Sequence, residues 1–403
     1  MSKSCISLFT MLFTFTLFLY HAIQTNPIDQ SILLYGVILV ILEALVTSTL
    51  RTVKPKADTL IINLVLLLLS VGCDTLLLVN QPLAAKQLMF SILGVVVIAI
   101  IVSWNNLKLR ILSLDKFLAV ISLILFVLPM TPLGSTVAGG NNWIQVGSVS
   151  FQPSELGKVT IILYMAVTCS SYKRTSYLED IKMLALPSSV IGISIILLMK
   201  QNDLGTALIL SILTIVLIYV ATNKVTYPIV AILFASLLFI TISKYYPHLQ
   251  NRLEAWRDPW SNYTTTGYQI CEGLYAISSG GYLGNPIEDV RYMDVSVCES
   301  DYIYTVICEE HGVYFSILLV LLYTILFLRC CYFSAVAKDK FSGLVILGIS
   351  ANLVLNVLIL LGGIYNLLPL TGLPLPFVSA GGSSLLVSFL GIGLIMNLSE
   401  VRE

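Results

Sequence analysis

The residues best suited to chemistry are acidic side chains at the end of a polar stretch that leads into an apolar segment. Residues 299–304 have the sequence ESDYIY, and residues 308–312 have the sequence CEEHG. A carboxylate in such a place, Asp301 for example, can act as a general base that accepts a proton from a reacting hydroxyl. The same acids could instead cap the first turn of the following helix. The segment therefore has a catalytic and a structural interpretation.

Two other charged motifs stand where apolar segments begin. Residues 151–158 have the sequence FQPSELGK, in which Glu155 and Lys158 are three positions apart and share one helix face. Residues 200–207 have the sequence KQNDLGTA, in which Asp203 precedes the apolar residues. Charges inside apolar spans are costly and usually mark function, so each motif is a candidate pocket. The alternatives are an ion pair that only stabilises the helix packing and a carboxylate that only caps a helix.

Two segments without strong charges are also candidates. Residues 368–384 have the sequence LPLTGLPLPFVSAGGSS, which interrupts the last apolar run with three prolines and three glycines. Irregular backbone at membrane depth is tolerated where it is buried or lines a cavity, although the glycines also suit close helix packing. Residues 139–144 have the sequence GGNNWI. Trp143 could contact a ligand or simply anchor the chain at a membrane interface.

The composition specifies the setting for these residues. The mean hydropathy is +0.92, and 57% of residues are hydrophobic while only 11% are charged, compared with about 25% charged residues in soluble domains. Apolar runs recur along the chain, and their lengths are close to the roughly 20 residues that a helix needs to span a bilayer. The period-two alternation of a membrane barrel is absent from the sequence. We therefore predict an all-α integral membrane protein, a polytopic helical bundle. The formal net charge of zero gives no indication of a nucleic-acid partner.

The apolar runs predict about twelve transmembrane helices. We expect them at residues 5–23, 31–50, 59–80, 86–105, 111–130, 153–171, 181–199, 204–222, 226–244, 310–331, 342–366 and 372–397.

The charges between the spans predict an orientation. With a cytoplasmic N-terminus, 15 of the 22 Lys and Arg residues fall on the inner side, as cytoplasmic loops require. We therefore expect a multi-pass protein of the cytoplasmic membrane with both termini cytoplasmic. Two long segments, 131–152 and about 245–309, then lie outside, the second before the tenth span. Cys271 and Cys298 both fall in the second segment and could form a disulfide, but two free thiols are the simpler expectation.

Five segments, in this order, resemble the SEDS family of bacterial cell-wall polymerases (RodA, FtsW and SpoVE). FQPSELGK resembles the family's FQPSE motif, and QNDLGTA resembles QPDLGTA. RDPWSNYTTTGYQ resembles a DPW…GYQ stretch, ESDYIYTVICEEHG resembles TDFIFAVIAEE, and PLTGLPLPFVSAGGSS resembles PVTGIPLPFISYGGSS. The family core has ten spans. The resemblance therefore implies two additional N-terminal transmembrane helices in residues 1–58 and a polymerase core in residues 59–403.

The resemblance implies a peptidoglycan glycosyltransferase. Such an enzyme polymerises lipid II into glycan strands on the outer membrane face and releases undecaprenyl pyrophosphate, in cell elongation, division or sporulation. Asp301 matches the family's proposed catalytic Asp and would be the general base. The residues that would bind substrate or brace its cavity are Trp143, Glu155, Lys158, Asp203, Arg291 and Ser379. Arg291 would offset the pyrophosphate charge, because a guanidinium pairs well with phosphate oxygens.

The resemblance also implies a class B penicillin-binding protein as partner. A divalent cation could assist departure of the pyrophosphate, but no cofactor is certain and no metal-ligand motif is visible in the sequence. Several positions depart from the family pattern: Asn202 replaces Pro, Asn141 and Asn142 stand where relatives often carry one or two basic residues, Leu360 replaces an expected Asn, and Ala380 replaces Tyr. Two other functions stay open: a lipid II flippase, and a scaffold that activates the partner transpeptidase. Neither of these needs a general base at Asp301.

Overall fold

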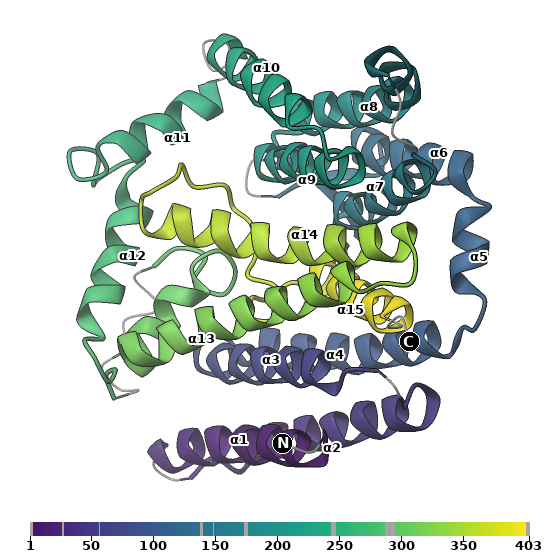
Figure 1. The fold of residues 1–403 in the computed structure, drawn as a ribbon. Helices are drawn as coiled ribbons and strands as arrows, with labels where there is room; N and C mark the ends of the chain where they lie inside the picture. Colours follow the sequence, from purple (N-terminus) through teal and green to yellow (C-terminus); the bar gives the residue numbers. More distant parts are fainter. Residues whose placement is uncertain are drawn as a thin grey trace. The chain divides into compact units, whose positions relative to one another are not determined.

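The computed structural model describes residues 3–25, 28–55, 57–137, 140–147, 149–172, 176–242, 247–286, 290 and 295–399. Helices dominate these residues (Figure 1). Among the described residues, eight helices are long and apolar enough to cross a membrane, and two further apolar helices, Thr226–Leu237 and Gly382–Leu398, are shorter. The prediction of a polytopic helical bundle is confirmed. The number of twelve spans remains a prediction.

The chain forms two compact units, each of which we describe by itself. The first unit contains residues 1–103, 251–329 and 356–396. Its helices are α1 (Lys3–Gln24), α2 (Gln30–Val53), α3 (Thr59–Val79), α4 (Gln81–Ser103), most of α11 (Pro247–Arg257), α12 (Tyr268–Ser279), most of α13 (Ile303–Ala335), the end of α14 (Lys340–Ile364) and α15 (Gly382–Leu398).

The core of the first unit is α3, on which α1, α2 and α4 all pack. Nearly every side chain of α3 from Ile61 to Leu77 is buried, as expected of a helix that is apolar on all sides. Asp58 caps α3 by accepting a hydrogen bond from the Leu60 N–H at 2.9 Å, and Asp29 caps α2 in the same way. The two N-terminal helices are therefore tied to the rest of this unit by packing along α3.

The second unit contains residues 104–250, 330–355 and 397–403. Its elements are α5 (Leu107–Leu112), α6 (Asp115–Val127), η1 (Leu128–Met130), β1 (Gly134–Val137), β2 (Gly140–Val146), β3 (Val149–Phe151), α7 (Pro153–Ser170), α8 (Tyr177–Lys200), α9 (Leu204–Thr222), α10 (Thr226–Ile242), the end of α13 and the start of α14. The helix α7 packs on α6, α8 and α9, and α9 also contacts α8 and α10.

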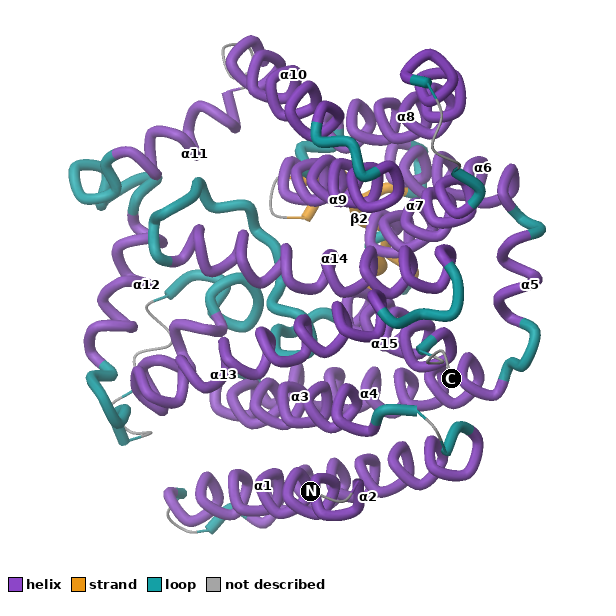
Figure 2. Tube along the Cα trace, viewed as in Figure 1, coloured by secondary structure: helices purple, strands orange, loops and turns teal. Residues whose placement is uncertain are grey.

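The second unit holds a three-stranded antiparallel sheet that the all-α interpretation did not include. The strand β2, orange in Figure 2, lies between β1 and β3. In β2 the buried side chains of Asn142 and Ile144 alternate with the exposed side chains of Asn141 and Gln145, which is the period-two pattern of a strand with one covered face. The described part of the segment 131–152, which we predict to lie outside, thus forms a platform of three strands that leads directly into α7.

The structure shifts the bounds of several predicted spans, two of them because the helix begins late, and it adds helices to the long segment before α13. The span predicted at 372–397 begins only at Gly382, because residues 365–381 form no helix. The span predicted at 111–130 begins at Asp115, after a break at Ser113 and Leu114. The long segment 245–309 contains α11 and α12, and its cysteines Cys271 and Cys298 are free and buried.

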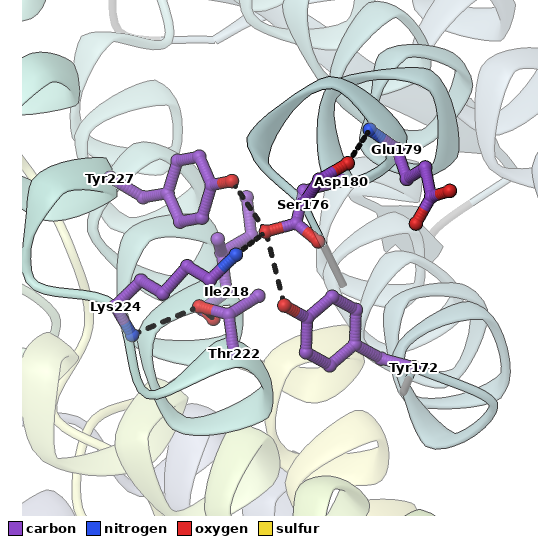
Figure 3. A network of polar contacts seen from close by, with 8 residues as sticks. All are labelled: Tyr172, Ser176, Glu179, Asp180, Ile218, Thr222, Lys224 and Tyr227. Carbon is purple, nitrogen blue, oxygen red and sulfur yellow. Dashed lines mark hydrogen bonds and ion pairs between the residues drawn. The ribbon is translucent and has the colours of Figure 1, made fainter. Parts of the chain in front are cut away.

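Polar contacts join loops that the charge pattern predicts on the same side. Figure 3 shows three side chains converging on buried Asp180, whose carboxylate accepts hydrogen bonds from Tyr172 Oη at 3.0 Å and Tyr227 Oη at 2.7 Å and pairs with Lys224. In the same unit, Lys108 Nζ lies 2.6 Å from Asp339 Oδ2. All of these residues belong to loops, or to helix ends beside loops, that we predict to be cytoplasmic. The contacts agree with that grouping, while the orientation of the termini stays a prediction.

Candidate functional site

Asp301 lies in the turn immediately before α13 and is partly buried. Its Oδ1 accepts a hydrogen bond from Ser300 Oγ at 2.7 Å. On the other side, a Cβ atom built on Gly372 would lie 3.2 Å from Asp301 Oδ2, and Gly372 has a φ of +72°. The irregular segment 365–381 therefore passes directly beside the carboxylate, and a residue without a side chain makes this approach possible.

The same irregular segment is hydrogen-bonded to the backbone carbonyls of Glu299 and Ser300. Ser379 Oγ donates a hydrogen bond to the Ser300 carbonyl at 2.6 Å and accepts one from the Leu375 N–H at 2.7 Å. The Ala380 N–H donates to the Glu299 carbonyl at 2.9 Å. Ser379, a predicted substrate-binding residue, thus stands beside Asp301 with its hydroxyl engaged in positioning the backbone.

The environment of Asp301 raises the pKa of its carboxyl group and so makes the carboxylate a stronger base. Burial raises the pKa of the Asp301 carboxyl above its ordinary value, and the charge of Glu299 acts in the same direction. The hydrogen bond from Ser300 and the positive charge of Arg252 act in the opposite direction without cancelling the rise. A carboxylate whose pKa is raised accepts a proton more readily, as a general base must.

The cation that faces Asp301 in the described part of the chain is Arg252 of α11. Its Nη1 donates a hydrogen bond to the Thr371 carbonyl at 3.3 Å, which brings the guanidinium to the segment beside the carboxylate. Sequence reasoning placed Arg252 in the long outer segment but gave it no role, because nothing in its spacing from Asp301 shows that the two meet. Arg291, to which that role was given, lies outside the described residues.

An apolar groove begins close to Asp301. Its volume is about 510 Å³. The first of its lining residues, Tyr304, is three positions after Asp301. Most of the others are aliphatic side chains of α13, α14 and the segment after α14, among them Ile317, Leu358 and Leu368. These three are 50%, 57% and 42% exposed, so the groove opens to the surroundings of the unit.

The remaining predicted site residues lie together in the second unit. Asp203 caps α9 by accepting a hydrogen bond from the Thr206 N–H through Oδ1 at 3.1 Å. Its Oδ2 accepts three more, from Asn142 Nδ2 at 2.8 Å, Gln152 Nε2 at 3.1 Å and Ser154 Oγ at 3.3 Å. The carboxylate therefore ties α9 to β2 and to the start of α7. Asp203 therefore does more than cap α9, whereas the sequence alone left open a simple cap.

Glu155 and Lys158 form the ion pair that their spacing predicts. Lys158 is completely buried, and its Nζ lies 2.9 Å from Glu155 Oε1. Both side chains stand on the first turns of α7, directly after the residues that bind Asp203. Trp143 is half-buried on β2 and pairs with Ser135 of β1. The structure thus gathers Trp143, Glu155, Lys158 and Asp203 around the platform of β1 to β3, and Asp301 with Ser379 in the other unit.

Comparisons with known proteins agree with this architecture. Residues 52–403 match the family model of FtsW, RodA and SpoVE, described as cell cycle proteins. The chain is 28% identical to stage V sporulation protein E of Bacillus subtilis, over 87% of this chain and 99% of that protein. It is 31% identical to a probable peptidoglycan glycosyltransferase FtsW of Geobacter, over 71% and 78%, and 25% identical to the peptidoglycan glycosyltransferase RodA of Mycobacterium tuberculosis, over 97% and 88%.

Two solved structures share the fold. A chain from a peptidoglycan synthase complex that coordinates polymerisation and crosslinking aligns with a TM-score of 0.73 at 24% identity, covering 85% of this chain and 98% of that one. The rod shape determining protein RodA of Thermus thermophilus aligns with a TM-score of 0.63 at 23% identity, covering 86% and 97%.

Proposed function

The chain belongs to the FtsW, RodA and SpoVE family of cell cycle proteins, and we propose that it is a peptidoglycan glycosyltransferase that polymerises lipid II into glycan strands. The observation that carries this proposal is the setting of Asp301. A carboxylate with a raised pKa is held between the turn before α13 and the irregular segment 365–381, with the cation Arg252 nearby and an apolar groove beginning three residues away.

The proposed step is a displacement at the anomeric carbon of the growing strand. Asp301 takes the proton of the acceptor sugar's 4-hydroxyl, and the oxygen forms the new glycosidic bond. The bond from the anomeric carbon to the pyrophosphate breaks, and undecaprenyl pyrophosphate leaves with the electron pair. Arg252 stands where a guanidinium would offset the charge that develops on the pyrophosphate. A divalent cation could share that role.

The groove supplies what a polyprenyl substrate requires. Its lining is aliphatic apart from Tyr304, Tyr365 and a glycine, and several lining side chains are exposed, which in a membrane protein means open to lipid. A hydrocarbon tail in this groove would bring its pyrophosphate to the level of the turn that carries Asp301. We therefore assign the groove to the lipid tail and the turn to the sugar and pyrophosphate.

The second unit has a supporting role in this proposal. The buried Glu155–Lys158 pair and the Asp203 brace fix the platform that carries Trp143, and the half-buried Trp143 is the side chain we assign to substrate contact. Residues 1–58 would be an addition to a polymerase core of residues 59–403. Catalysis would take place on the outer face of the cytoplasmic membrane, with both termini in the cytoplasm and a class B penicillin-binding protein as partner.

Reconstitution in liposomes separates polymerisation from transport. Purified protein with a class B penicillin-binding protein is given fluorescent lipid II. Glycan strands are measured on gels before and after muramidase digestion, and transbilayer movement is measured by quenching of the outer leaflet. Strands without accelerated movement support the polymerase. Accelerated movement without strands would favour the flippase, and neither activity in folded protein would favour the scaffold.

A further inference from the structure

A buried cluster of four titratable side chains lies in the first unit outside the site around Asp301. His21 is at the end of α1, Asp74 is in α3, and Glu310 and His311 are adjacent in α13. His21, Asp74 and Glu310 each offer a ligand atom, and these atoms all lie within 4.8 Å of one another. Their exposed fractions are 4%, 0% and 7%, and the side chain of His311 is 10% exposed, so the cluster is largely shielded from water.

The polar atoms of the cluster are only partly satisfied. His21 Nδ1 and Asp74 Oδ1 are hydrogen-bonded at 2.9 Å. Asp74 Oδ2, Glu310 Oε2 and His311 Nε2 have no hydrogen-bond partner among the described residues. Unpaired buried carboxylate oxygens are costly, above all in a membrane, unless a cation balances them. Two such oxygens beside an unpartnered imidazole nitrogen therefore indicate a missing cation.

The separations of the three unpartnered atoms suit a shared ion. His311 Nε2 lies 4.0 Å from Asp74 Oδ2 and 3.7 Å from Glu310 Oε2, which is too far for hydrogen bonds. Zinc binds His nitrogen and carboxylate oxygen at about 2.0–2.2 Å in tetrahedral geometry, so two ligands of one ion are about 3.3–3.6 Å apart. A movement of a few tenths of an ångström would bring both separations to this distance.

We propose that Asp74 Oδ2, Glu310 Oε2 and His311 Nε2 bind one divalent transition-metal ion of the zinc type. Imidazole with carboxylates is a donor set that such ions favour. His21 holds Asp74 through its other oxygen, the arrangement in which a neighbouring hydrogen bond orients a metal ligand. The ion joins α3 to α13, and the hydrogen bond of His21 to Asp74 connects α1, which precedes the family match at residues 52–403, to the same site.

The backbone around the ligands is built to hold them. Gly312 follows His311 with a φ of +78° and breaks the helical geometry of α13. Its neighbour Val313 donates its N–H to the Gly281 carbonyl at 3.0 Å, and the Asn285 N–H donates to the Glu309 carbonyl at 2.9 Å. The two ligands on α13 are thus fixed from both sides, in the helix that follows the turn of Asp301.

The test uses the purified full-length protein in detergent, stripped with a chelator and dialysed against Zn²⁺ or Co²⁺. Bound metal is measured by mass spectrometry, Co²⁺ coordination by its visible absorption, and stability by thermal unfolding. We expect one ion per chain, a Co²⁺ spectrum of nitrogen and oxygen ligands, and a higher Tm with metal than without it.

Matched variants locate the ion. Glu310→Gln and His311→Asn should lose the bound metal, and His21→Asn should weaken the affinity about 10–100-fold, the usual effect of removing an orienting partner. Glu43→Gln is the control, because Glu43 is also a buried carboxylate of this unit, with Oε1 bonded to Thr14 and Oε2 without a partner among the described residues, but it does not belong to the cluster. Binding that persists in the Glu310 and His311 variants would overturn the site. A wild-type protein that binds no metal would also overturn the proposal. If Glu310→Gln and His311→Asn fail to fold, the affinity of His21→Asn, the mildest change, decides between the two outcomes.

Discussion

Replacing Asp203 by Asn should destabilise the protein while changing the side-chain volume very little. The carboxylate accepts four hydrogen bonds, one through Oδ1 from the Thr206 N–H and three through Oδ2 from Asn142, Gln152 and Ser154. The amide of Asn can keep the cap through its oxygen, but its NH₂ group then faces the amide donors of Asn142 and Gln152. The hydrogen bonds from Asn142 and Gln152 are lost, and their N–H groups then face the N–H groups of the new amide.

The size of the effect follows from the number of bonds lost. A hydrogen bond to a charged group contributes about 1.5–3 kcal/mol, and neighbouring bonds do not add fully. We therefore expect a loss of about 3 kcal/mol for Asp203→Asn. Asp203→Ala also removes the cap, which contributes about 1 kcal/mol, so its loss should be about 4 kcal/mol.

Thermal unfolding in detergent measures both variants. A chain of this length should lose roughly 1–2 °C of Tm per kcal/mol, so Asp203→Asn should unfold several degrees below wild type and Asp203→Ala lower still. The exposed Glu179→Gln in the same unit is the control and should change nothing. A native Tm for Asp203→Asn together with lost polymerisation would refute the brace and indicate a direct chemical role for Asp203.

Three further perturbations follow from local geometry. Asn202 has a φ of +60° and donates its N–H to a carbonyl. Asn202→Pro, which introduces the residue of the family motif, should therefore lower the free energy of unfolding by about 3 kcal/mol. Asn202→Gly should stay within about 1 kcal/mol of wild type in the same unfolding assay. Gly372→Ala puts a methyl group 3.2 Å from Asp301 Oδ2, at a left-handed position where a side chain costs about 1–2 kcal/mol. The rate of polymerisation should fall at least about tenfold. Gly381→Ala, whose methyl group meets only an ordinary contact, should leave this rate nearly unchanged. Because burial raises the pKa of Asp301, the rate of polymerisation should rise with pH, with a midpoint above the ordinary aspartate pKa of about 3.9. Arg252→Gln removes a charge that lowers this pKa and should move the midpoint to higher pH. An unchanged midpoint would contradict the assigned electrostatics.

The helices were predictable because their cause is local. A run of apolar residues needs no partner to be recognised, so α2, α3 and α9 fall within a few residues of the predicted spans. The start of α15 was wrong by ten residues, because apolar composition continues through the prolines of 372–381 while the backbone there does not form a helix. The sheet was missed because β1 and β3 are only four and three residues long.

The chemistry of single residues was predictable, but their partners were not. The spacing of Glu155 and Lys158 predicts their ion pair because both stand on one helix. The contact of Arg252 with the segment beside Asp301 joins residues 119 positions apart, and the cluster of His21, Asp74 and Glu310 joins three helices. Such meetings arise from tertiary packing, which one sequence without a structure does not show.

The most direct test of the account is polymerisation of lipid II by Asp301→Asn beside wild type and the control Glu254→Gln, each with the same class B penicillin-binding protein. Glu254 is an exposed carboxylate of the same unit. The account predicts glycan strands from wild type and Glu254→Gln and none from a folded Asp301→Asn, which keeps the shape of the side chain but cannot accept the proton. Strands of normal length and rate from Asp301→Asn would contradict the assignment of Asp301 as the base.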